Sequence, residues 1–195
     1  MKRFFNTSSM MLFIVLAFFA CSKNDPQTDR SPDYYFEFKV NETKLEYPMQ
    51  KAQINLTGTL SYDGKTGHHT IHVAGMKDLH QPLKNTLSFI MVDQTGFSTR
   101  VNYCNIPGAG ASFPSFMFTM GYYDANGQLY SAAGAGDQDM FDLYEPAFIE
   151  FTEITEAYIV GKFSGTLRWY ESSGGTNVLK GTVVISNGQF KVPRY

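Results

Sequence analysis

The feature of the sequence that most restricts its fold is a long alternation of side-chain character between Tyr158 and Trp169. Successive side chains of a β-strand point to opposite faces, so this alternation predicts one long strand with a single buried face. The expected outward residues are polar: Lys162, Ser164, Thr166 and Arg168. The expected inward residues are Ile159, Gly161, Phe163, Gly165, Leu167 and Trp169.

Shorter strand patterns, separated by turn signals, run through the rest of residues 34–195. Strands are expected at 34–40, 44–47, 51–60, 68–74, 86–92, 98–104, 116–123, 128–132, 147–154, 178–185 and 189–192. Turns are expected at Asn41-Glu42, Asp63-Gly64, 124–127, 172–177 and Asn187-Gly188. The stretch 86–92 is apolar on both faces, which predicts a central strand. Together these patterns predict an antiparallel β-sandwich, with a partly closed β-barrel as the alternative.

The first twenty residues have the three-part layout of a secretory signal. Lys2 and Arg3 form a positive beginning, 10–19 is an uncharged apolar run, and small Ala20 follows. The apolar run is far shorter than the ~20 residues that a membrane-spanning helix needs. We therefore expect residues 1–20 to be removed as a signal peptide.

The end of this run, Phe18-Phe19-Ala20-Cys21, resembles a bacterial lipobox. The resemblance implies that the Cys21 thiol receives a diacylglycerol and that its new amino group is acylated, so that the membrane is a partner through acyl chains. Stable anchoring needs more than one such chain. Residues 22–33 are polar apart from two prolines and predict a flexible tether, so the divisions are 1–20, 21–33 and a domain at 34–195. The alternative is an ordinary secretory signal with Cys21 merely nearby.

The two ends of the domain resemble small lipoproteins of the Bacteroidota that carry β-rich domains of unknown function. The similar stretches are Tyr-Phe-Glu-Phe-Lys-Val-Asn at 35–41 and Gly-Thr-Val-Val-Ile-Ser-Asn-Gly-Gln-Phe-Lys-Val-Pro-Arg at 181–194. The resemblance implies a lipid-anchored β-sandwich at the outer membrane, facing the periplasm or the cell surface. It brings no catalytic residues to this chain.

Charge and cysteine content exclude some classes of protein. The net charge is −2 and no basic run occurs, so we expect no nucleic-acid partner. The chain has two cysteines, and a lipid on Cys21 would leave Cys104 without an intrachain partner. Cys104 is most simply a small buried residue.

Two groups of residues have side chains that can bind metal ions. His68 and His72 share one face of a predicted strand but lie ~13 Å apart, too far for one ion unless the chain bends. Asp137 and Asp139 follow a glycine-rich stretch, but their spacing does not match a calcium-binding loop. Surface histidines and a solvated acidic loop are the favoured interpretations, so we expect no metal site and no cofactor.

Aromatic residues are the remaining candidates for binding. Tyr123 and Tyr170 are expected on the outward side of their strands, where they could stack on sugar rings. Packing in the core or at its rim is the favoured interpretation, because β-proteins use aromatic residues there routinely. The long loops at 105–115 and 133–146 are the expected places for ligand contacts, since β-scaffolds present function on loops. The sequence contains no nucleophile, metalloprotease or phosphate-loop motif, so we expect no catalytic residues and no enzymatic activity.

The sequence therefore predicts a lipid-anchored cell-envelope protein with a non-enzymatic binding or scaffolding role. The expected partner is a glycan or another envelope protein. The alternatives are a fimbrial, self-assembling subunit, which would add a strand from a neighbour to an open sheet edge, and a glycan-processing enzyme with two facing carboxylates.

Overall fold

The computed structural model describes residues 34–50, 52–136 and 143–195. The predicted signal peptide, the tether and Cys21 lie outside the described residues, as do the calcium candidates Asp137 and Asp139. The predictions for those residues remain predictions.

The described residues form eleven β-strands and no α-helix, which confirms the predicted all-β class. The strands are β1 (Tyr35–Val40), β2 (Thr43–Pro48), β3 (Leu56–Asp63), β4 (His68–Met76), β5 (Thr86–Asp93), β6 (Asn102–Cys104), β7 (Met117–Tyr123), β8 (Leu129–Ala135), β9 (Ala147–Ile154), β10 (Tyr158–Ser173) and β11 (Thr176–Pro193). No helix in the described part of the chain could span a membrane.

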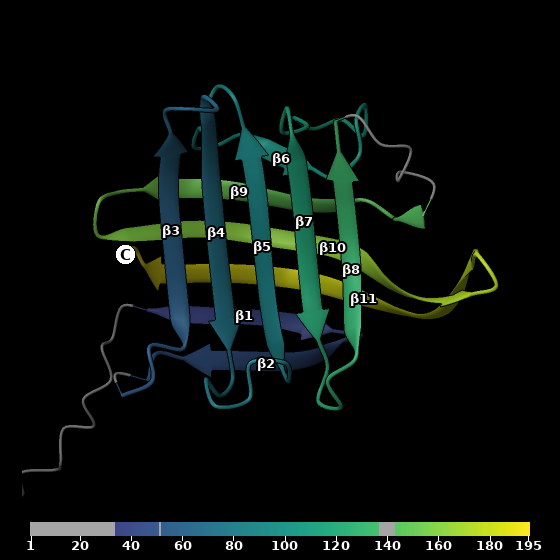
Figure 1. Ribbon diagram of the computed structural model, residues 1–195. Coiled ribbons are helices and arrows are strands. Elements are labelled where there is room, and N and C mark those ends of the chain that lie inside the picture. Colours follow the sequence, from purple (N-terminus) through teal and green to yellow (C-terminus); the bar gives the residue numbers. More distant parts are fainter. Residues whose placement is uncertain (1–33, 51, 137–142) are drawn as a thin grey trace, which may run out of the picture.

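The strands form two layers that cross each other (Figure 1). The front layer has the order β3-β4-β5-β7-β8, and the back layer has the order β2-β1-β11-β10, with β9 and then β6 beyond β10. All of these neighbours pair antiparallel. β5 lies at the middle of the front layer, as its apolar sequence predicted.

Strand β10 connects the two layers. Its first half pairs with β9, whereas Arg168 in its second half pairs with Ser131 of β8. One continuous sheet therefore folds over itself into a sandwich shaped like a nearly closed barrel, with one unsealed seam. At the edge of β3, a single parallel bridge joins Gly58 to Arg194 at the end of β11. Both the predicted sandwich and its barrel alternative fit this shape.

The core between the layers is filled with aromatic rings. Phe89 of the front layer lies 5.3 Å from Phe190 of the back layer, measured between ring centroids. Phe36 and Phe163 of the back layer lie 5.2 Å apart, and all four side chains are at most 4% exposed. Rings at these separations pack favourably beyond the area that they bury. The back layer is thereby fixed against the inner face of the front layer.

Two of the predicted turns are two-residue hairpin turns. Asn41 and Glu42 join β1 to β2 with positive φ values of 45° and 69°. Gly174 and Gly175 join β10 to β11 with φ values of 59° and 82°. Turns of this handedness match the twist of the flanking strands, which is why Asn and Gly are favoured there.

The prediction of a turn at Asn187-Gly188 was wrong. Strand β11 runs through this point, and Asn187 is one extra residue relative to both neighbouring strands, which makes a β-bulge. Asn187 adopts φ 51°, a value that Asn tolerates better than most residues. A Cβ atom on Gly188 would lie 2.6 Å from the ring of Phe163, so only glycine fits there.

Three other predictions needed correction. The strand predicted at 51–60 begins at Leu56, because the preceding residues form a turn in which Ile54 is 47% exposed. The strand predicted at 98–104 is limited to β6. Trp169, expected in the core, is only half-buried, and the β10–β11 register shifts directly after it. It packs edge-on against Tyr130 at 6.3 Å.

Candidate functional site

The two histidines considered as metal ligands lie on β4 without forming a metal site with other residues. The His68 ring lies 4.8 Å from the ring of Phe116. His72 stands between Thr59 and Ile90 of the neighbouring strands, and burial lowers its pKa. Among the described residues, no three His, Cys, Asp or Glu side chains lie close enough together to hold a metal ion.

The two tyrosines considered for sugar stacking lie in different parts of the fold. Tyr123 ends β7, where it pairs with Thr86 and Leu129. Tyr170 pairs with Leu179 in the β10–β11 hairpin. Both are half-buried, and the structure does not bring them together into one platform.

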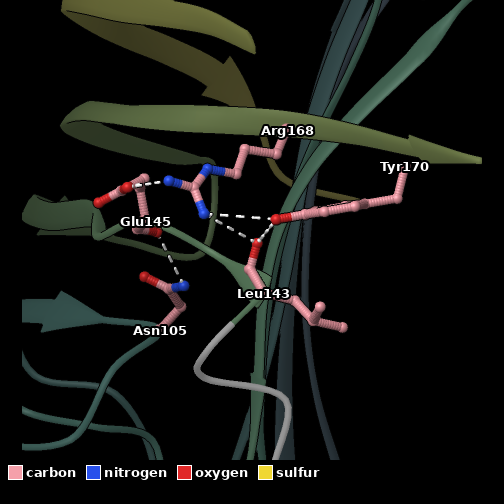
Figure 2. Close-up of polar contacts among 5 residues, drawn as sticks. All are labelled: Asn105, Leu143, Glu145, Arg168 and Tyr170. Atoms are coloured by element: carbon pink, nitrogen blue, oxygen red, sulfur yellow. Dashed lines mark hydrogen bonds and ion pairs between the residues drawn. The ribbon is translucent and has the colours of Figure 1, made fainter. Parts of the chain in front are cut away.

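A polar cluster lies where β10 passes from one layer to the other (Figure 2). Asn105, which follows β6, is fully buried. Its amide nitrogen donates to the carbonyl oxygens of Ala133 and Glu145, each at 3.2 Å. Its amide oxygen accepts from the backbone N–H of Ala147 at 2.7 Å. One side chain therefore joins the end of β6, strand β8 and the start of β9.

Arg168 contacts the same segment from the other side (Figure 2). One terminal nitrogen forms an ion pair with the Glu145 carboxylate, and the other donates to the Leu143 carbonyl and the Tyr170 hydroxyl, each at 3.3 Å. The Tyr170 hydroxyl also donates to the Leu143 carbonyl. The polar groups of this cluster mostly bind one another, so the cluster holds the chain entering β9 and offers little capacity for a ligand.

Cys104 lies beside this cluster and is buried. Its sulfur contacts the Asn105 amide oxygen at 3.6 Å and accepts from the Ile106 N–H at 3.4 Å. Burial raises the pKa of the thiol, which keeps it protonated and weakly nucleophilic at neutral pH. These contacts agree with the interpretation of Cys104 as a small core residue.

The outer face of the front layer has a different character. Because Ile71, Phe89 and Phe118 point into the core, the residues next to them on β4, β5 and β7 point outward. Three rows of outward residues cross all five strands in register. They are Thr57, Ala74, Ser88, Gly121 and Ser131; Thr59, His72, Ile90, Thr119 and Ala133; and Ser61, Thr70, Val92, Met117 and Ala135.

We call these fifteen residues the uncharged face. None of them is Asp, Glu, Lys or Arg, although these four types make up 17% of the chain. Every one except Ala74 is half-buried or exposed, and Figure 1 shows no described element over the front layer. Charged residues appear only around it, with Asp63 at the end of β3, Lys77 after β4 and Asp124 after β7.

The outer face of the back layer is densely charged by comparison. Its outward residues include Glu37, Lys39, Lys44, Glu46, Glu150, Lys162 and Lys191. Lys44 contacts both Glu37, at 3.2 Å, and Glu46 on the exposed surface. Exposed pairs of this kind add little to the free energy of folding, but together they keep this layer well solvated. The two layers therefore present opposite kinds of surface to their surroundings.

The uncharged face shares one property with the centres of protein interfaces, its lack of Asp, Glu, Lys and Arg. The buried centres of such interfaces are depleted in charged residues and surrounded by a polar rim. The sequence analysis did not single out these residues. Each strand alone shows only a few uncharged outward positions, and the common face exists only once the order of the five strands is known.

No family model, curated protein or solved structure matches this chain. The features of this chain that bear on its function are therefore the sequence motif at Cys21 and the two faces of the domain.

Proposed function

We propose that this protein is a lipid-anchored cell-envelope module that binds another protein through its uncharged face and has no enzymatic activity. The observation that carries the proposal is the contrast between the two outer faces. Fifteen outward residues of the front layer carry no acidic side chain, lysine or arginine, whereas the back layer alternates Lys and Glu. A binding role explains why one face alone lacks these charges.

The chemistry of the face favours a protein over other partners. It has no cation to attract nucleic acid or anionic lipid. It also has no Phe, Tyr or Trp in its three rows, and Tyr123 lies beyond them at the end of β7. Sugar-binding surfaces use such rings, so a face of mostly threonine, serine and aliphatic side chains fits a protein surface better.

Three of the described carboxylates are paired with basic side chains, which supports a non-enzymatic role. Glu37 and Glu46 line one pocket together, but both bind Lys44 on the open surface. Glu145 is bound by Arg168. A glycan-processing enzyme would instead need two facing carboxylates kept available for acid and base roles.

The membrane anchor is tested at Cys21. In cells grown with an alkyne analogue of palmitate, the wild-type chain should be labelled and should remain with the membrane fraction. Cys21→Ala should lose the label and leave that fraction, because the acyl chains supply the binding free energy. Continued labelling of Cys21→Ala would refute the lipid anchor.

The docking surface is tested by a photo-crosslinking amino acid placed in intact cells. Position 90, at the centre of the uncharged face, is compared with position 152, a half-buried position outside that face, at the register shift between β9 and β10. We expect a protein adduct from position 90 and none from position 152. The proposal fails if position 90 gives no adduct, or if both positions give the same ones.

A further inference from the structure

We propose that three loops at one end of the front layer rest on the lipid bilayer, with aliphatic side chains at the headgroup boundary and two lysines against anionic headgroups. The loops follow β2, β4 and β7, and their described residues are 49–50 with 52–55, 77–85 and 124–128. We call them the tip loops. The inference rests on the lipid anchor of the proposed function, which brings the domain to a membrane, and adds the orientation that a flexible tether does not set.

The tip loops are joined to one another by hydrogen bonds. The Gln50 side chain donates to the Lys77 carbonyl at 3.2 Å, which connects the first loop to the second. The Asn85 N–H donates to the Asp124 carbonyl at 3.1 Å, which connects the second loop to the third. Figure 1 shows all three at the lower ends of the front strands. They therefore move as one surface.

This surface exposes large aliphatic side chains. Ile54 of the first loop is 47% exposed, and Leu79 and Leu83 of the second loop are 39% and 58% exposed. Binding to a membrane surface strengthens with the apolar area buried at the headgroup boundary and with attraction to anionic lipids. Aliphatic side chains at the ends of loops can enter that boundary without any change in the strands behind them.

The tip loops also surround a polar hollow of about 450 Å³. Lys77 and Lys84 line it, and neither forms an ion pair with another described residue. Asp78, the one acid among its described lining residues, already accepts from the His80 N–H at 2.9 Å and from the Gln81 amide at 3.3 Å. Two lysines beside exposed leucines suit an anionic lipid headgroup, because the lysines attract its phosphate while the leucines contact the acyl region.

The start of the domain places the tether at the same end. Tyr35 pairs with Pro48, the last residue of β2, so the chain enters β1 beside the first tip loop. The predicted tether at 22–33 has a root-mean-square reach of ~20 Å. The opposite end of the front layer lies about 30 Å further away along the nine residues of β4. An acylated Cys21 would therefore hold the tip loops, and not that opposite end, close to the bilayer.

This orientation leaves the uncharged face free. The front strands run away from the tip loops, so the face that they carry would stand upright on the membrane and open to its side. A protein partner could then reach that face without displacing lipid.

The first test measures contact with lipid in the full-length protein, acylated in cells and reconstituted into vesicles of phosphatidylcholine and phosphatidylglycerol that contain a spin-labelled quencher lipid. A fluorophore is attached to Leu83→Cys in a tip loop or to Lys65→Cys in the exposed turn at the other end of β4. Cys104 is buried and should not compete for the label. We expect several-fold stronger quenching at position 83, and equal quenching at both positions would overturn the proposal.

The second test removes the attraction while the label stays at position 83. Lys77→Gln combined with Lys84→Gln should lower the ratio of docked to undocked protein about fivefold per lysine in these vesicles, and should have no effect in phosphatidylcholine alone. Leu79→Ser should lower quenching in both kinds of vesicle. Lys65→Gln, the matched control, should not change it. The proposal fails if the lysine and leucine variants all leave quenching unaltered, or if Lys65→Gln lowers it equally.

Flotation of the same vesicles distinguishes this inference from the proposed function. If the wild type floats with the vesicles but position 83 is quenched no more than position 65, the anchor stands and the contact of the tip loops is refuted. If the wild type does not float, the anchor and the inference that rests on it are both refuted. Thr119→Lys, which places a charge at the centre of the uncharged face, should leave quenching at position 83 unchanged, and a loss there would contradict the separation of the two surfaces.

Discussion

Replacing Asn105 with alanine should destabilise the domain strongly, because this one amide joins three segments. The substitution removes its bonds to the Ala133 and Glu145 carbonyls and to the Ala147 N–H. The side chain is fully buried, so water cannot replace these partners. At a net ~1 kcal/mol for each hydrogen bond, the loss is about 3 kcal/mol, and more if the Ala147 N–H stays unsatisfied.

The assay is urea unfolding of the purified protein, followed by tryptophan fluorescence. At a urea m-value of ~1–3 kcal/mol/M, a loss of about 3 kcal/mol should lower the urea midpoint by roughly 1–3 M. Asn102→Ala, three residues earlier on the exposed side of β6, is the matched control and should cost less than about 0.5 kcal/mol. If the two variants are equally stable, the assignment of Asn105 as the connecting residue is wrong.

Three further predictions concern other parts of the fold. The Tyr47 hydroxyl is buried and finds no hydrogen-bond partner among the described residues, so Tyr47→Phe should leave urea stability equal or raise it by about 1 kcal/mol; a clear loss would contradict this. A Cβ on Gly134 would lie 1.9 Å from the Asn105 carbonyl oxygen, so Gly134→Ala should lower the free energy of unfolding in urea by about 3 kcal/mol or more. Gly64→Ala, on an exposed turn, should leave that free energy unchanged. Burial lowers the pKa of His72 in the folded chain, so around and below pH 6.5 the unfolded chain binds more protons at this residue than the folded chain does. The part of the folding free energy that depends on neutral His72 is therefore fully present above its ordinary pKa of 6.5 and is lost as the pH falls. Urea unfolding at about pH 7.5 and pH 5 should therefore show a smaller acid loss for His72→Gln than for the wild type, and equal losses would exclude this role.

Most of the strands could be predicted from local patterns, because each has one buried face. The stretch 147–154 matches β9 over its whole length, with Ile149 and Phe151 buried as expected. The hairpin turns at Asn41-Glu42 and Gly174-Gly175 followed from residues that accept positive φ. These features depend on near neighbours in sequence, which is why alternation and turn chemistry reveal them.

The buried polar residues could not be predicted in the same way. Asp93 accepts bonds from the N–H groups of Thr95 and Ser115. The Asn55 amide donates to the carbonyl oxygens of the last residues of β2 and β4. Their partners lie up to 22 residues away in sequence. In sequence, a polar residue next to an apolar run looks the same whether it faces water or is buried and hydrogen-bonded to the backbone of another segment. Only the tertiary fold distinguishes the two cases.

The uncharged face could not be predicted from the sequence for the same reason, because it too depends on contacts between distant segments. The outward residues of each front strand were visible in the sequence, but five strands had to be placed in order and in register before they formed one surface. The bulge at Asn187 also depends on strands on both sides of β11. Long-range pairing therefore determines the candidate site, whereas local pattern determines the strands that carry it.

Hydroxyl-radical footprinting of Met117 in intact membranes tests the central claim most directly. Met117 lies within the uncharged face, between Val92 and Ala135, and exposed Tyr195 provides the internal reference. If a protein covers this face, oxidation of Met117 relative to Tyr195 should be low in the wild type and should rise several-fold in Thr119→Lys but not in Thr152→Lys. Equal oxidation of Met117 in all three proteins would show that the face is open to solvent and would contradict the proposed docking surface.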